Sequence, residues 1–148
     1  MLASAVILIG IQATGKSSLY QMYYKDTHIR INLDMLKTRN RENQLLDCCL
    51  KIKQPFVIDN TNLRVEDRQK YITKIQKYEV PILGYYFSSK LDQALIRNLE
   101  RGNQTIPEMG ILSAYTRLEL PSYSEGFDYL YYIQLENGKF KIQDYLEG

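Results

Sequence analysis

The chain has 148 residues, which is enough for one domain with a hydrophobic core and too few for two domains of ordinary size. Hydrophobic residues make up 45% and charged residues 24%, a composition that argues against a predominantly disordered chain. The formal net charge of +2 does not by itself indicate a nucleic-acid-binding protein.

The first predicted elements flank a glycine-rich loop. A short buried strand over 5–9 and a helix over 16–25 enclose GIQATGKS, residues 10–17, which fits the pattern G-x-x-x-x-G-K-[ST]. Glycines in such a loop let consecutive N–H groups turn inward around phosphate oxygens. The loop predicts a bound nucleoside triphosphate with Mg²⁺. The candidate binding residues are Gly10, Thr14, Gly15, Lys16, Ser17 and Ser18, with Ser17 on the metal.

Strand and helix patterns then alternate along the chain. Residues 28–33 and 55–58 are predicted strands, and residues 36–52 form the helix between them. A helix over 64–78 and a strand over 81–87 continue the order. Strands separated by helices predict a mainly parallel α/β sheet that carries helices on both faces and binds ligands at the carboxyl ends of its strands.

The C-terminal part of the chain predicts two further helices and a hairpin. The helices cover 91–101 and 107–118, and the hairpin strands cover 129–136 and 139–142. The hairpin is centred on Asn137-Gly138, a pair that suits the positive φ angles of a tight turn. We therefore expect one domain over residues 1–148.

Two carboxylates follow predicted strands at the expected ligand edge. Asp59 ends an apolar strand, where a nucleotide-binding fold holds a carboxylate of the Mg²⁺ site, or else it caps the turn at Thr61 or Asn62. Asp34 is either the base that accepts a proton from a substrate hydroxyl or an N-cap of the next helix.

Arg97 and Arg101 lie four residues apart in a predicted helix, so both guanidinium groups share one face. Guanidinium forks match phosphate oxygens, and a helix that carries two of them beside a polar loop resembles a lid. The alternative is ordinary surface charge.

The chain resembles the polynucleotide 5′-hydroxyl kinase family nearly end to end. The resemblance rests on residues 10–17, on Asn32-Leu33-Asp34 with Lys37, on residues 58–62, and on Arg97-Asn98, Arg101-Gly102 and Ile106-Pro107. It implies an adenylate-kinase-like P-loop NTPase fold with a helical lid, and ATP and Mg²⁺ as cosubstrates. It further implies transfer of the γ-phosphate to a 5′-hydroxyl of DNA or RNA.

The resemblance also implies roles for single residues. Asp34 matches the catalytic aspartate, Lys16 and Ser17 match phosphate and metal contacts, and Arg97 and Arg101 match lid arginines. Arg101 is the better match for the arginine on the ATP phosphates, which makes Lys16, Asp34 and Arg101 the catalytic candidates.

The chain departs from the family at the predicted substrate contacts. Leu33 stands where the family often has arginine, and Lys37 stands at an arginine that grips a substrate phosphate. Lysine lacks the bidentate fork, so we expect weaker docking, with Arg68 compensating from the next helix. Residues 30–74 hold ten Lys or Arg and six Asp or Glu, and we expect either one basic face or solvated helices. Further backbone contacts are predicted at Arg39, Arg41 and Arg64.

The leading hypothesis is a 5′-hydroxyl kinase of nucleic acid, with Asp34 as base and a groove that leads to it from Lys37. A P-loop kinase of a small metabolite or nucleotide and a noncatalytic nucleotide-binding switch are the alternatives. Any end-healing or ligase partner is expected to be a separate protein. No apolar run approaches ~20 residues, so we expect a cytoplasmic protein without membrane contact. The oligomeric state stays open.

Overall fold

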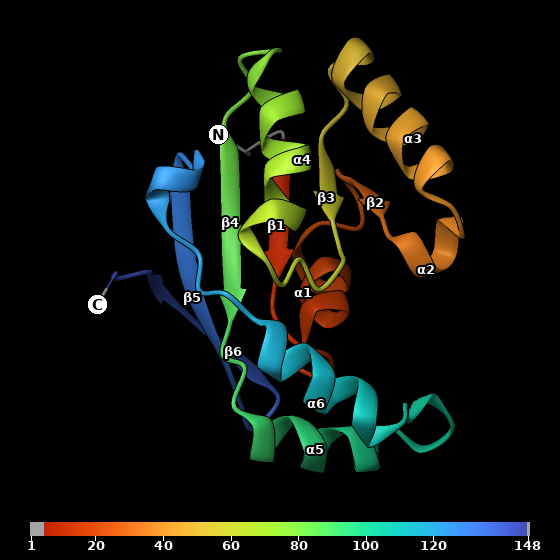
Figure 1. Ribbon diagram of the computed structural model, residues 1–148, viewed down its shortest axis with the longest axis vertical. Coiled ribbons are helices and arrows are strands. Elements are labelled where there is room, and N and C mark those ends of the chain that lie inside the picture. Colours follow the sequence, from red (N-terminus) through yellow and green to blue (C-terminus); the bar gives the residue numbers. More distant parts are fainter. Residues whose placement is uncertain (1–4, 148) are drawn as a thin grey trace.

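Uninterrupted hydrophobic runs form the centre of the sheet. The computed structural model describes residues 5–147. It has one six-stranded sheet in the order β2-β3-β1-β4-β5-β6 (Figure 1). All five residues of β1 are buried, as expected for a parallel strand covered on both faces. The strands are β1 (Ala5–Ile9), β2 (Ile29–Ile31), β3 (Phe56–Ile58), β4 (Ile82–Phe87), β5 (Tyr129–Glu136) and β6 (Lys139–Asp144).

The helices cover both faces of the sheet. Residues of α1 pack with Val6 and Leu8, whereas residues of α3 and α4 pack with Ile7 and Ile9 on the opposite face. A third cluster, around Ile11, joins α5 and α6 at the carboxyl ends of β1 and β4 (Figure 1). The predicted α/β P-loop architecture is confirmed. The helices are α1 (Lys16–Tyr23), α2 (Leu33–Leu36), α3 (Arg39–Ile52), α4 (Val65–Gln76), α5 (Leu91–Glu100) and α6 (Glu108–Arg117), with 3₁₀ turns η1 (Gly102–Gln104) and η2 (Tyr123–Glu125).

The segment predicted as one helix over 36–52 is broken in the structure. Lys37 ends α2 with a φ of 77°, and Thr38 starts α3 by accepting a hydrogen bond from the Arg41 amide. The predicted strand over 28–33 is correspondingly shorter, because Asn32 caps α2. Asp34 is therefore the second residue of α2, and its reading as an N-cap is wrong.

The predicted C-terminal hairpin is confirmed. Asn137 and Gly138 have φ angles of 50° and 75°, and β5 and β6 pair antiparallel from Glu136 opposite Lys139. In the part of the chain that the structure describes, every helix is too short or too polar to cross a membrane.

Candidate active site

The glycine-rich loop leads directly into α1. Gly15 is the N-cap residue of that helix, and its φ of 101° favours glycine. A Cβ atom there would lie 2.9 Å from Cε1 of Phe140 in the C-terminal hairpin. The hydroxyl of Thr14 donates to the Ile11 carbonyl across 2.8 Å and so ties the loop to itself. Ser18 is exposed in the first turn of α1, where backbone N–H groups lack helical partners and can bind an anion.

Lys16 folds back onto this loop. Its Nζ donates to the carbonyls of Gly10 (2.9 Å) and Ile11 (2.7 Å), and the residue is 9% exposed. Burial lowers the pKa of Lys16 to about 8, with a smaller lowering from the charge of Arg101 and an opposing effect from Asp59. Arg101 therefore lies near enough to Lys16 for its charge to act on the ammonium group. The arrangement suits the phosphates of a nucleotide.

The lowered pKa of Lys16 predicts a pH-dependent stability difference. The folded pKa of about 8 lies below the ordinary value of 10.5, so the unfolded chain holds more protons between these pH values. Burial of the Lys16 charge therefore lowers the free energy of unfolding by its full amount below pH 8. This destabilisation disappears as the pH rises toward 10.5. Lys16→Met should raise the Tm of the nucleotide-free protein by about 5 °C at pH 7. Calorimetry across this range should show the gain shrinking; a constant difference would contradict the shift.

The side-chain oxygens of Ser17, in α1, and Asp59, directly after β3, lie next to each other. Ser17 Oγ donates to Asp59 Oδ2 across 3.0 Å, and Asp59 is 3% exposed. The carboxylate accepts bonds from Ser17 and Arg30 through Oδ2, and no bond from the backbone of Thr61 or Asn62 to this carboxylate is present among the described residues. Two hard oxygens this close fit a Mg²⁺ site in which triphosphate oxygens and water supply the other ligands.

Hydrogen bonds fasten α2 beside this pair. The side-chain amide of Asn32 donates to the backbone carbonyl of Asp59 across 2.6 Å, and the backbone N–H of Leu33 donates to Asn60 Oδ1 across 2.9 Å. These bonds bring the start of α2 to the end of β3. Asp34, one residue further on, is exposed at the same edge of the sheet. A carboxylate there can reach an acceptor that remains largely in solvent.

A buried polar network holds Asn60 in turn. Glu42 is 1% exposed and accepts bonds from Asn60, Tyr71 and Arg39, each 2.9 Å long. Burial is the largest cause that raises the pKa of Tyr71 to about 12, with the charge of Glu42 next. This network is not evident from the sequence, since Glu42 occupies an ordinary polar position of a predicted helix. Its partners Asn60 and Tyr71 lie 18 and 29 residues away.

The predicted lid arginines take different places. Arg97 Nη2 donates to the Leu135 carbonyl of β5 across 2.8 Å, whereas Arg101 is exposed at the end of α5. The buried Asn98 side chain bonds the backbone of Ile106 in both directions and so fixes the loop that carries Arg101. A cavity of about 320 Å³ lies beside Arg97. Of the two arginines, Arg101 is the one whose charge lowers the pKa of Lys16.

The prediction that Arg68 contacts substrate is wrong. Its side chain is 0% exposed and forms a two-pronged ion pair with Glu125, at 2.7 and 3.1 Å. Its remaining nitrogen donates to the carbonyls of Asn62, Leu63 and Glu119. Arg68 therefore holds together the loop before α4 and the segment after α6.

The other predicted substrate cations are exposed. Lys37 lies at the end of α2, on the same short element as Asp34, and remains available to a ligand. Arg41 donates to the Leu36 carbonyl at 3.3 Å, and Arg64 forms a 3.5 Å ion pair with Glu66.

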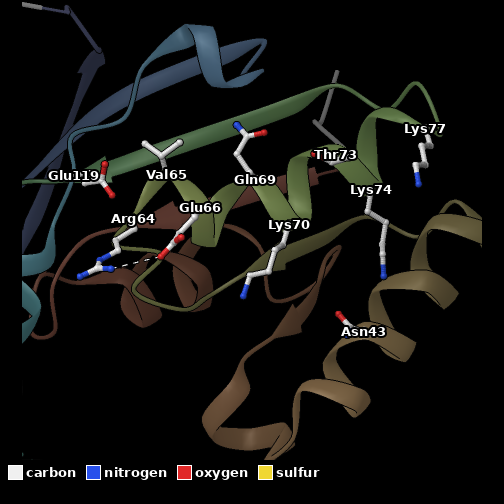
Figure 2. A pocket seen from close by; sticks show the side chains of 10 residues that line it. All are labelled: Asn43, Arg64, Val65, Glu66, Gln69, Lys70, Thr73, Lys74, Lys77 and Glu119. Atoms are coloured by element: carbon white, nitrogen blue, oxygen red, sulfur yellow. Dashed lines mark ion pairs between the residues drawn. The ribbon is translucent and has the colours of Figure 1, made fainter.

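A groove of about 1020 Å³ runs beside α4 (Figure 2). Figure 2 shows Lys70, Lys74 and Lys77 along this helix, with Asn43 of α3 opposite. Neither Lys37 nor Asp34 lines it, so it differs from the groove expected between those two residues.

Comparisons with known proteins agree with this architecture. The sequence model of the AAA_33 family, described as an AAA domain, matches residues 6–121. A bifunctional polynucleotide phosphatase/kinase of Schizosaccharomyces pombe is 31% identical over 127 residues, covering 82% of this chain and 31% of the relative. An L-seryl-tRNA(Sec) kinase of Methanococcus maripaludis is 23% identical over 142 residues, covering 83% of this chain and 55% of the relative. The chain thus spans about a third of the first relative and about half of the second.

Solved structures share the fold at low sequence identity. Kti12 of Chaetomium thermophilum, in complex with ADP-AlF3, has a TM-score of 0.70 and 12% identity, with 90% of both chains covered. A gluconokinase from Sinorhizobium meliloti 1021 has a TM-score of 0.66 and 14% identity, with 88% of this chain and 82% of that chain covered. These similarities establish a P-loop kinase fold.

Proposed function

Since the chain belongs to the AAA_33 family of AAA domains, we propose that it transfers the γ-phosphate of ATP to a 5′-hydroxyl end of DNA or RNA. One observation carries the proposal: hydrogen bonds fasten α2, the helix of Asp34, directly to Asp59 and Asn60 beside the Ser17–Asp59 pair. A γ-phosphate held at that pair would lie next to the element that carries a candidate base.

In this proposal the loop binds the donor. Lys16 and the N–H groups at the start of α1 hold the phosphates, and Arg101 adds positive charge from the lid. Ser17 and Asp59 hold Mg²⁺, which neutralises charge on the phosphates when bound. A lysine on phosphate gives up its bonds to Gly10 and Ile11, so donor binding rearranges the Lys16 ammonium.

Asp34 then orients the acceptor hydroxyl and accepts its proton. Phosphoryl transfer passes through a loose transition state, so the value of the carboxylate lies mainly in aligning the attacking oxygen. Lys37, at the other end of α2, supplies a point charge for a phosphate of the acceptor.

The names of the two relatives support a nucleic-acid acceptor, because one is a polynucleotide phosphatase/kinase and the other a kinase of seryl-tRNA. The exposure of Asp34 agrees with an acceptor whose bulk stays outside the protein.

The proposal is tested with ATP labelled at the γ-phosphate. The protein is offered a 5′-hydroxyl oligonucleotide, the same oligonucleotide with a 5′-phosphate, and a panel of small alcohols that includes gluconate. Label on the 5′-hydroxyl oligonucleotide alone is the expected result. Label on small alcohols alone would indicate a metabolite kinase, and ATP binding without transfer to any acceptor would indicate a nucleotide-binding switch.

A further inference from the structure

Arg30 contacts both oxygens of the pair assigned above to Mg²⁺. Its Nε donates to Asp59 Oδ2 across 2.8 Å, and its Nη2 donates to Ser17 Oγ across 3.2 Å. Since Ser17 Oγ also donates to Asp59 Oδ2, the three side chains form a closed triangle. The guanidinium uses the same two oxygens that a metal ion requires.

The position of Arg30 in the sheet explains this contact. It is the middle residue of β2 and lies opposite Val57 of β3. Val57 belongs to the cluster on the α1 face of the sheet, so Arg30 points to the side from which Ser17 projects. The Arg30 side chain is 27% exposed, whereas Asp59 is nearly buried, so the guanidinium can leave toward solvent while the carboxylate cannot.

A guanidinium and a divalent cation exclude each other at this site. Arginine offers only N–H donors, whereas Mg²⁺ requires free oxygen lone pairs. We propose that Arg30 is the resident cation of the Ser17–Asp59 pair, so that Mg²⁺ alone binds poorly and enters with ATP, which displaces the guanidinium. This inference rests on the proposed function, because it assigns the pair to the metal of bound ATP.

Displacement of Arg30 requires both the metal ion and the phosphates of the incoming Mg–ATP complex. Mg²⁺ alone must break the Arg30–Asp59 ion pair without any new partner for the released guanidinium. With ATP, the phosphates offer that guanidinium new oxygen acceptors and supply ligands to the metal. Metal binding and nucleotide binding are therefore coupled through Arg30.

The first test measures Mn²⁺ binding to the nucleotide-free protein by electron paramagnetic resonance, with Mn²⁺ as the probe for Mg²⁺. Arg30→Gln should bind Mn²⁺ about tenfold more tightly than the wild type, because the competing cation is gone. Arg30→Lys, which keeps the charge without the fork, should fall between them. Arg117→Gln, an exposed arginine of α6, is the matched control and should match the wild type. Equal Mn²⁺ affinity in Arg30→Gln and the wild type would overturn the inference.

The second test is measured on the wild type, and Arg30→Lys serves only to assign one resonance. The Nε–H resonance of Arg30, assigned by its loss in Arg30→Lys, should stay in place with Mg²⁺ alone. It should shift when Mg²⁺ is added with a nonhydrolysable ATP analogue. An unchanged resonance with the analogue bound, or a shift with Mg²⁺ alone, would contradict displacement. Failure of the analogue to bind would count against the proposed function instead, and neither test uses an acceptor.

Discussion

Asp34→Asn is expected to lower kcat for phosphorylation of a 5′-hydroxyl oligonucleotide by about 10²–10⁴-fold, the usual contribution of a positioned base. The amide keeps the shape of the side chain but cannot accept the proton. The KM for ATP should change little, because the phosphates are assigned to Lys16 and the start of α1. Steady-state kinetics at saturating ATP measure both parameters.

The fold should tolerate Asp34→Asn. Within residues 5–147 the Asp34 carboxylate has no hydrogen-bond or ion-pair partner, and the residue is exposed. The Tm should therefore stay near the wild-type value. Asp26→Asn, another exposed aspartate in the turn after α1, is the control and should keep full kcat. Full activity of Asp34→Asn would show that Asp34 is not the base.

Arg68→Met is expected to lower the free energy of unfolding by about 3–5 kcal/mol, because it leaves the Glu125 carboxylate buried without its partner. The loss also frees the carbonyls of Asn62, Leu63 and Glu119. The loop before α4 and the segment after α6 would then lose their common anchor. Urea denaturation measures the effect.

A second substitution separates the buried charge from other causes. Adding Glu125→Gln to Arg68→Met should recover part of the stability, since the unpaired charge is removed. If Arg68→Met instead kept the wild-type stability and weakened oligonucleotide binding, a substrate role for Arg68 would return.

The sequence predicted the parts of the fold that depend on local pattern. The loop at 10–17 specified its own strand and helix, and Asn137-Gly138 specified the hairpin, because both rest on backbone conformations that few residues favour. The break before α3 was missed although Thr38 is a good N-cap residue. Apolar spacing across residues 36–52 suggested one continuous helix.

The site was predictable only where a motif places its residues. Ser17 and Asp59 were found as a pair because each follows a strand at the carboxyl edge of the sheet. Arg68 was misread because nothing near it in the sequence reveals Glu125, which lies 57 residues away. Arg30 was missed for the same reason, since its contact with Asp59 spans 29 residues. A charged side chain looks the same in sequence whether tertiary contacts bury it or leave it in solvent.

In the proposed reaction, a phosphate donor and a hydroxyl acceptor meet between the Ser17–Asp59 pair and Asp34. The most direct measurement is a crystal structure with a nonhydrolysable ATP analogue, Mg²⁺ and a short 5′-hydroxyl oligonucleotide. We expect the 5′-oxygen to lie about 3 Å from the Asp34 carboxylate and to face the γ-phosphate. An ordered 5′-end bound away from Asp34, or a γ-phosphate directed elsewhere, would contradict the proposed reaction.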